Sequence, residues 1–410
     1  MGRFEITDNL KISGNYFKWL AISLFLIQCS AHSGENMEDV QPKDIITGAE
    51  QMDLFLPKLE GNRIALVVNH TSMVKDSHLV DTLLLSGINI VRVFSPEHGF
   101  RGDIDDGEAV ESGVDKSTGI PISSLYGKTQ KPFEEDLLDV DLVIFDIQDV
   151  GTRFYTYIST MNYVMEACGE NGVPFMVLDR PNPNGDYIDG PVLNKGFESF
   201  VGLHAIPVVH GLTVGELAGM INGEGWLSDS TKCDLTVIPV ANYNHSLTYE
   251  PPVKPSPNLP TYNAIRWYPT TCFFEGTVMS EGRGTQNPFE LIGFTDPDMG
   301  EFSFTPVSIK GMSMYPKYKD ETCWGIDLRN VVPERKINLQ VVIDFYNKFK
   351  AKGEEGTFFK DYFNTLAGTD KLQKQIVSGL AEEEIRASWQ AELEAYKKLR
   401  ERYLLYPDSE

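Results

Sequence analysis

The sequence predicts an α/β protein with a mostly parallel sheet and a second, smaller α/β domain towards the C-terminus. Five short apolar runs in the first half of the chain end on polar residues, which is typical of buried parallel strands. Helical apolar patterns lie between several of these runs, as expected for strand–helix–strand units. The length of 410 residues is sufficient for two domains.

Polar or charged residues that could take part in catalysis or binding follow the last apolar position of each run within a few residues. The runs are Ile64–Val68 before Asn69 and His70, Ile88–Phe94 before Glu97 and His98, Leu142–Ile147 before Gln148 and Asp149, Pro174–Leu178 before Asp179 and Arg180, and Ile206–Val209 before His210. Ligands of open α/β sheets bind outside the carboxyl ends of the strands. We therefore expect all five ends to meet at one active-site rim.

Three helices and one further strand are expected between and after these runs. Residues 79–84 have helical apolar spacing and are followed by Gly87, which suits a helix end. Residues 157–172 repeat that pattern. Thr213 and Glu216 have the spacing of a capping box, so a helix should begin after His210. Leu235–Val240 is the expected further strand.

The second half of the chain begins with a break in regular structure. The proline-rich stretch Tyr249–Pro260 cannot form a helix or a central strand, because proline fixes φ and lacks an N–H donor. We place a catalytic domain at residues 44–291 and the smaller domain at residues 292–410. The smaller domain should close with a long helix over residues 381–404, whose apolar stripe packs into the core.

The N-terminus resembles an export sequence. Trp19–Ile27 is apolar, follows Lys11 and Lys18, and is too short to span a bilayer. Leu26–Cys29 resembles a bacterial lipobox, which would make Cys29 the lipidated residue; an ordinary signal peptide cut nearby is the alternative. We expect a signal peptide at residues 1–28, a tether at 29–43, and a periplasmic or cell-surface lipoprotein.

Charge and missing motifs exclude several function classes. A net charge of −23 argues against binding to nucleic acid or to an anionic membrane, apart from attachment through the lipid anchor. No dinucleotide fingerprint, Walker motif or G-x-S-x-G elbow occurs, and we expect no cofactor. The cysteines after residue 29 are widely scattered, and we expect no metal site.

Glu97 is the strongest candidate for a catalytic group. A carboxyl between a proline and a histidine, on a loop that leaves a buried strand, can be partly desolvated and act as a general acid. The alternative is a structural role, either as a salt-bridge partner of Arg101 or as the cap of a loop. His98 can serve as a second acid or base, or orient Glu97. Asp179 can be a structural partner of Arg180, whose guanidinium suits a carboxylate.

Several long motifs resemble one family. They are V-V-N-H-T at 67–71, F-S-P-E-H-G-F-R-G at 94–102, D-I-Q-D-V-G-T-R-F-Y-T-Y at 146–157, L-D-R-P-N-P at 178–183, P-N-L-P at 257–260, and F-E-G-T at 274–277 with G-R-G-T at 282–285. They are similar to motifs of the DUF1343 proteins, which include the NamZ-type exo-β-N-acetylmuramidases. The resemblance spans residues 44–406. It implies a Rossmann-like domain joined to a smaller α/β domain, with release of N-acetylmuramic acid from non-reducing ends of peptidoglycan fragments.

The resemblance also implies roles for particular residues. The family's catalytic glutamate corresponds to Glu97, and Glu275 or Glu281 is the candidate for the second carboxyl. If the substrate's own acetamido group is the nucleophile, Asp146 or Asp149 would orient it. Arg153 or Arg180 would meet the lactyl carboxylate. The full set of expected substrate contacts is Asn69, His70, Asp146, Gln148, Asp149, Arg153, Tyr155, Arg180, Asn182, His210 and Arg283.

Two other function classes remain open from the residues alone. One is a non-catalytic surface lipoprotein that binds glycan fragments. The other is a metal-dependent esterase or amidase that uses His70, His98 and His210 as ligands.

Overall fold

The computed structural model describes residues 44–408 except residues 98, 101–111 and 128. The expected signal peptide, Cys29 and the tether lie outside the described residues. Within the described part of the chain, no helix combines the length and apolar character needed to cross a membrane.

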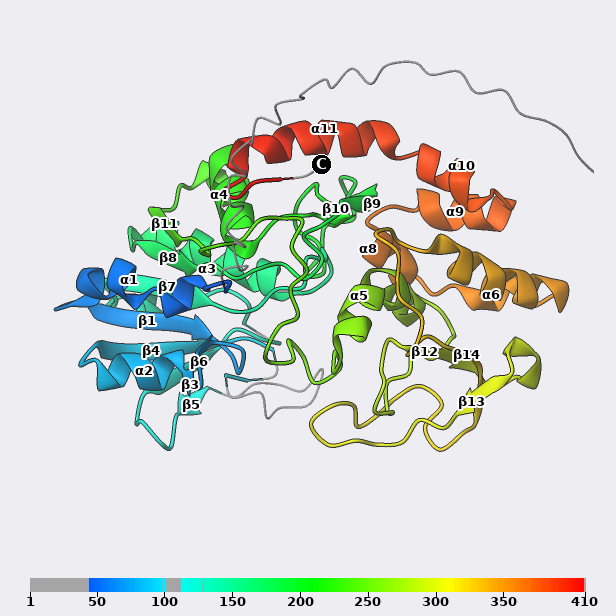
Figure 1. Cartoon of the computed structure of the whole chain (residues 1–410), viewed down its shortest axis with the longest axis horizontal. Coiled ribbons are helices and arrows are strands. Elements are labelled where there is room, and N and C mark those ends of the chain that lie inside the picture. Colours follow the sequence, from blue (N-terminus) through cyan, green and yellow to red (C-terminus); the bar gives the residue numbers. More distant parts are fainter. Residues whose placement is uncertain (1–43, 98, 101–111, 128, 409–410) are drawn as a thin grey trace, which may run out of the picture. The chain divides into compact units, whose positions relative to one another are not determined.

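A seven-stranded sheet forms the core of the N-terminal part (Figure 1). Its order is β11-β8-β7-β1-β4-β6-β5, and only β5 runs antiparallel to its neighbour. The strands are β1 (Arg63–Val68), β4 (Asn89–Ser95), β5 (Gly113–Val114), β6 (Pro121–Ser124), β7 (Leu142–Asp146), β8 (Phe175–Leu178) and β11 (Leu235–Ile238). From β1 the chain builds outwards through β4 to β6, then returns to the other side of β1 with β7. The sheet is therefore doubly wound, with its switch point between β1 and β7.

Helices cover both faces of this sheet because alternate residues of a strand point to opposite faces. Ile64, Leu66 and Val68 of β1 pack with α1 (Met52–Leu59) and α2 (Leu79–Leu85). Ala65 and Val67 belong to the core that contains α3 (Tyr157–Asn171) and α4 (Val214–Glu224). The buried β1 thus has helices on either side.

The predicted helix ends are confirmed. Helix α3 ends at Gly172, whose φ of 66° is the left-handed conformation that glycine adopts without strain. At the start of α4, Thr213 Oγ1 accepts a bond from the Glu216 amide at 3.2 Å, and Glu216 Oε2 accepts from the Thr213 amide at 2.9 Å. This is the capping box that the sequence predicts.

The expectation that five strand ends share one rim is wrong for the fifth run. Pro207–Val209 forms β10, which pairs antiparallel with β9 (Asp189–Val192) in a separate two-stranded sheet. A three-residue apolar run contains no information about its pairing partner. The other runs supply β1, β4, β7 and β8, and Leu235–Val240 supplies β11.

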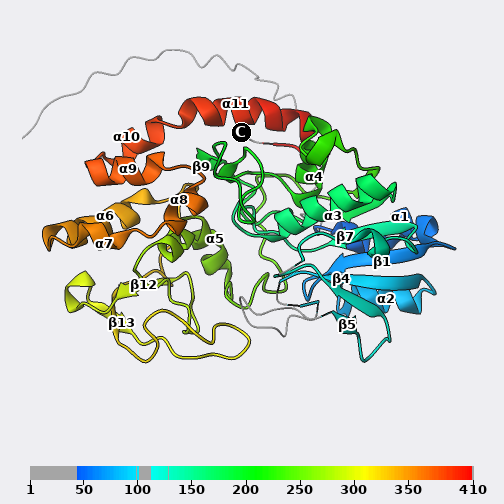
Figure 2. The same ribbon diagram turned by 180° about the vertical axis from the view of Figure 1, so that it is seen from behind.

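The C-terminal part combines a small antiparallel sheet with helices (Figure 2). The sheet has the order β12-β14-β13. In the N-terminal part, β2 and β3 form a short separate ribbon before α2. The remaining bounds are β2 (Met73–Val74), β3 (Ser77–His78), α5 (Tyr262–Thr271), β12 (Leu291–Phe294), β13 (Phe302–Phe304), β14 (Cys323–Asp327), α6 (Leu339–Ala351), α7 (Glu355–Phe358), α8 (Tyr362–Ala367) and α9 (Lys371–Ser378). Residues 44–410 cluster as one compact unit, and the proposed boundary at residue 292 stays a prediction.

The expected long closing helix is two helices. Helix α10 (Glu382–Ala387) ends before Ser388, and α11 (Gln390–Arg400) begins after Trp389. The predicted core stripe is nevertheless buried at Ile385, Trp389, Leu393 and Tyr396. Helix α11 extends back over the N-terminal part, where the Tyr396 hydroxyl donates to the His210 carbonyl at 2.7 Å (Figure 1).

Candidate active site

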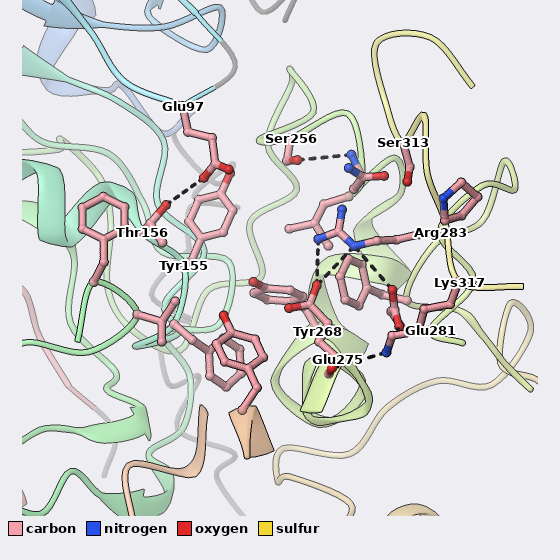
Figure 3. Close-up of a pocket in the computed structure, with 18 of the residues that line it drawn as sticks. Glu97, Tyr155, Thr156, Ser256, Tyr268, Glu275, Glu281, Arg283, Ser313 and Lys317 are labelled. Carbon is pink, nitrogen blue, oxygen red and sulfur yellow. Dashed lines mark hydrogen bonds and ion pairs between the residues drawn. The ribbon is translucent and has the colours of Figure 1, made fainter. Parts of the chain in front are cut away.

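A cavity of about 570 Å³ opens where the N-terminal and C-terminal parts meet. Glu97 and Thr156 lie on one side of it, and Glu275, Arg283 and Lys317 lie on the other (Figure 3). The irregular segment Tyr249–Pro260 lies between the parts and contributes Ser256, Asn258 and Leu259 to the wall.

Glu97 lies just beyond β4 and beside the start of α3. Its Oε2 accepts a hydrogen bond from Thr156 Oγ1 at 3.1 Å, and its carbonyl oxygen is 3.5 Å from the Tyr157 hydroxyl. The glutamate is half-buried. These contacts turn the carboxyl towards the cavity (Figure 3). His98 and Arg101, the expected neighbours of Glu97, lie outside the described residues.

Aromatic rings form the floor of the cavity. Tyr268 contacts Phe154, Tyr155 and Phe289 edge-on, with ring centroids 5.3, 6.1 and 4.9 Å apart. The Tyr155 hydroxyl donates to the Pro255 carbonyl at 2.6 Å, which fixes the crossing segment. Burial raises the pKa of both Tyr155 and Tyr268 well above the usual range, so both remain neutral phenols.

An ion-pair network faces Glu97 from the opposite wall. Arg283 donates to Glu275 Oε1 through Nη2 at 2.7 Å and through Nε at 3.2 Å, and its Nε is 3.5 Å from Glu281 Oε1. Lys317 Nζ lies 3.0 Å from Glu281 Oε2. The guanidinium also lies over the Phe289 ring, 5.2 Å from its centroid. The network fixes two carboxylates and a guanidinium at the cavity wall.

The backbone near Glu275 is fixed by close packing. Glu275 lies in the short 3₁₀ helix Cys272–Gly276. A Cβ at Gly276 would lie 2.4 Å from the Phe363 Cα, so only glycine fits against α8. Lys317 Nζ also donates to the carbonyls of Phe274 and Met279, each at 2.9 Å. Lys317 therefore connects the ion-pair network to the backbone of the cavity wall around Glu275.

The structure places Arg180 and Asp146, two of the expected substrate contacts, away from the cavity. Arg180 Nε and Nη2 bind the two carboxylate oxygens of Asp146 at 2.5 and 3.0 Å, and both residues are buried away from the cavity. The pair lies at the carboxyl end of β7, beside the switch point. The Arg180 guanidinium therefore pairs with a protein carboxylate outside the cavity.

Arg153 is likewise placed away from the cavity. It is completely buried, and its Nη1 and Nη2 donate to four carbonyls, those of Pro191, Ile206, Leu366 and Ala367, at 2.8–2.9 Å. Burial lowers the pKa of Arg153 to about 9. Because Leu366 and Ala367 belong to α8, Arg153 joins the two parts of the protein instead of meeting substrate.

The remaining strand-end candidates hold loops together. Asn69 Oδ1 accepts from the Thr71 amide, and Gln148 Nε2 donates to the Pro181 carbonyl. Asp149 Oδ2 accepts from the Gly151 amide at 2.7 Å and is 3.5 Å from His210 Nε2. The other two also bond to backbone: His70 Nε2 contacts the Lys254 carbonyl, and Asn182 Nδ2 donates to the Leu212 carbonyl. None of these six residues lines the described cavity.

Five predicted residues do come together around the cavity: Glu97, Tyr155, Glu275, Glu281 and Arg283. Sequence reasoning missed Thr156, Tyr268 and Lys317 as cavity residues. Thr156 lies inside a quoted motif and could have been found there, whereas no pattern marks Tyr268 or Lys317. In the described part of the chain, no group of three or more His, Cys, Asp or Glu residues is arranged to hold a metal ion.

Comparisons with known proteins agree with the motif resemblance. Two family models match: the N-terminal domain of exo-β-N-acetylmuramidase NamZ over residues 64–263, and its C-terminal domain over residues 266–406. The peptidoglycan β-N-acetylmuramidase NamZ of Bacillus subtilis strain 168 is 40% identical over an alignment of 383 residues, and the match covers 87% of this chain and 90% of that protein.

Two crystal structures of DUF1343 family proteins from Bacteroides fragilis NCTC 9343 are also similar. The first has a TM-score of 0.83 and 45% identity, covering 90% of this chain and 100% of that one. The second has a TM-score of 0.77 and 31% identity, covering 88% of this chain and 99% of that one.

Proposed function

The chain belongs to the NamZ family of exo-β-N-acetylmuramidases, and on that premise we propose that it is a glycoside hydrolase that releases N-acetylmuramic acid from the non-reducing ends of peptidoglycan fragments. Peptidoglycan-derived saccharides are its substrates, and cell-wall turnover is its role. The observation that supports the chemistry is the pair of carboxyl residues, Glu97 and Glu275, on opposite sides of one cavity (Figure 3).

Glu97 acts as the general acid in this proposal. Its carboxyl donates a proton to the glycosidic oxygen while the bond from that oxygen to the anomeric carbon breaks, so the aglycone leaves as an alcohol. Thr156 orients the carboxyl through its hydrogen bond to Oε2. Glu97 is half-buried, and the buried aromatic residues of the cavity floor limit the access of water to its carboxyl.

Glu275 is the proposed second group, which faces the anomeric carbon as it becomes positive. As the anionic partner of Arg283 it is held in a fixed position, either to attack that carbon or to activate a water. A carboxyl separation of about 5–5.5 Å would give retention, and about 6.5–9.5 Å inversion. Asp146 and Asp149, the candidates for orienting a substrate acetamido group, do not line the cavity, which favours Glu275.

Arg283 takes the role first expected of Arg153 or Arg180. N-acetylmuramic acid differs from N-acetylglucosamine by a lactyl ether that carries a carboxylate. Arg283 and Lys317 are the cationic side chains that line the described cavity. A guanidinium can bind a carboxylate with two parallel N–H groups, which the Lys317 ammonium cannot, so we assign recognition of the lactyl carboxylate to Arg283.

We also propose that the protein is exported and anchored by a lipid at Cys29. The apolar stretch Trp19–Ile27 and the lipobox-like sequence before Cys29 support this placement. An extracytoplasmic location would expose the enzyme to peptidoglycan fragments. Metabolic labelling with a radioactive fatty acid should mark the wild type and not Cys29→Ser; equal labelling of both would contradict the anchor.

The test of the catalytic proposal uses Glu97→Gln and two substrates with different leaving groups. Loss of a general acid costs about 10²–10⁴-fold in kcat. The loss should be larger for methyl β-N-acetylmuramide than for the para-nitrophenyl glycoside, because an aryl oxide leaves without a proton. The matched control, Glu134→Gln, changes an exposed glutamate that lies outside the cavity.

The outcomes separate the candidate functions. Equal losses on both glycosides would contradict an acid role for Glu97. Tight saccharide binding without turnover by either wild type or variant would favour the non-catalytic glycan-binding protein. Activity that a chelator abolishes would favour the metal-dependent esterase or amidase.

A further inference from the structure

The aromatic residues that line the cavity range from buried to almost fully exposed, with Tyr126 and Phe200 half-buried and Tyr362 39% exposed. Phe154, Tyr155, Tyr268 and Phe289 are at most 8% exposed and form the floor. Tyr315 also lines the cavity but is 88% exposed, so its ring lies at the mouth. Single exposed aromatic residues are common on protein surfaces, and exposure alone therefore implies no function.

The backbone around Tyr315 distinguishes it from an ordinary surface residue. On its N-terminal side, the Met312 carbonyl accepts from Asn258 Nδ2 at 2.9 Å, and the Met314 carbonyl accepts from Ser308 Oγ at 2.6 Å. These two bonds attach the loop to the cavity wall and to itself. Asn258 is itself buried and lines the cavity.

The C-terminal side of the loop is fixed as firmly. Pro316 is buried, and a Cβ at Gly284 would lie 2.5 Å from the Pro316 ring, so this contact requires glycine. Lys317 belongs to the ion-pair network with Glu281. Tyr315 therefore projects into solvent from a short segment whose neighbours on both sides are anchored.

A rigid backbone that presents an uncovered ring lowers the entropy cost of binding, because the platform is ordered before the ligand arrives. The apolar C–H face of a pyranose ring covers such an aromatic surface and removes it from water. In an exo-acting hydrolase the terminal sugar enters the cavity, and the remainder of the chain extends outwards past the mouth. Tyr315 is placed where that remainder emerges.

We infer that Tyr315 is the stacking platform for the sugar that follows N-acetylmuramic acid, so that it binds the departing N-acetylglucosamine unit. The inference rests on the proposed function. It makes Tyr315 a specificity-determining residue that recognises a saccharide aglycone and contributes nothing to a substrate that lacks one.

The experiment compares two substrates that share the N-acetylmuramyl unit. One is the disaccharide in which N-acetylmuramic acid is β-linked to N-acetylglucosamine; the other is methyl β-N-acetylmuramide. We expect Tyr315→Ala to lower kcat/KM for the disaccharide about tenfold and to leave the methyl glycoside within about twofold. Tyr315→Phe keeps the ring and should retain the wild-type ratio. Phe133→Ala removes another exposed ring, which lies outside the cavity, and serves as the matched control.

The results separate this inference from the function on which it rests. If the wild type cleaves both substrates and Tyr315→Ala has the same ratio of the two kcat/KM values, the stacking role of Tyr315 would be overturned, while the proposed muramidase activity would stand. Equal losses on both substrates would also overturn it, because they would indicate a structural role for Tyr315. A well-folded wild type that cleaves neither substrate would overturn the proposed function, and the platform with it.

Discussion

Replacement of Arg283 by glutamine should reduce the preference of the enzyme for a charged lactyl group. The change removes the positive charge and keeps a polar side chain at the cavity wall. A hydrogen bond to a charged group contributes about 1.5–3 kcal/mol. Because the Arg283 side chain is 19% exposed, solvent screening is incomplete but present, and the lower half of that range applies.

The predicted magnitude follows from the conversion of about 1.4 kcal/mol to each factor of ten. Arg283→Gln should lower the selectivity for para-nitrophenyl β-N-acetylmuramide, over its neutral lactyl-amide analogue, about tenfold to fortyfold. Arg283 also positions Glu275 through two hydrogen bonds, so kcat should fall for both substrates. The ratio of the two kcat/KM values cancels that shared loss and isolates the carboxylate contact.

The matched control is Arg266→Gln, which breaks the ion pair of Arg266 with Asp186 outside the cavity. It should lower stability and leave the selectivity ratio unchanged. If Arg283→Gln reduced turnover of both substrates equally, Arg283 would act only by holding Glu275, and its assignment to the lactyl carboxylate would be refuted.

Two further predictions concern stability. Arg180→Ala should lower the free energy of unfolding by about 3–5 kcal/mol, because it leaves the buried Asp146 charge unpaired, and KM should stay at the wild-type value. Denaturant unfolding measures the stability, and initial rates measure KM. A changed KM with unchanged stability would instead favour a substrate-binding role for Arg180. Burial raises the pKa of Asp179 to about 6. Between about pH 4 and pH 6 the folded protein therefore holds a proton that the unfolded chain releases. The free energy of unfolding should fall by about 3 kcal/mol as the pH rises through that range. Calorimetry across the range should show that slope for the wild type and not for Asp179→Asn; parallel curves would contradict it.

Strands β1, β4, β7 and β8 of the main sheet could be predicted because each lies in a mainly apolar run. Strands β5 and β6 at the edge of that sheet could not be predicted, because they are only two and four residues long and carry no such run. Helices α3 and α4 could be predicted because their ends are encoded locally, by Gly172 and by the Thr213–Glu216 capping box. The pairing of β10 could not, since the antiparallel partner β9 contains Gly190 and Pro191 and carries no strand pattern. The break between α10 and α11 could not be predicted either, because no proline or glycine marks it in the sequence.

The candidate site was predictable only in part. Glu97, Glu275 and Arg283 lie in long motifs that resemble the family, and all three line the cavity. Arg153 and Arg180 lie in motifs of the same kind, yet both are buried structural residues. Neither the residue type nor the motif tells an arginine that lines the cavity from one that is buried. The groups that bind each guanidinium come from distant segments of the chain.

The cavity draws its lining residues from both parts of the protein. In a doubly wound sheet the ligand crevice usually lies at the switch point, here between β1 and β7. The Arg180–Asp146 pair occupies that end of β7, and the cavity lies instead beyond β4, where Glu97 meets the wall built around Glu275. Neither part carries both carboxyls. The distance between the two carboxyls, which would decide the stereochemical course, therefore depends on the contacts that join the parts, among them the bonds of Arg153 to the Leu366 and Ala367 carbonyls.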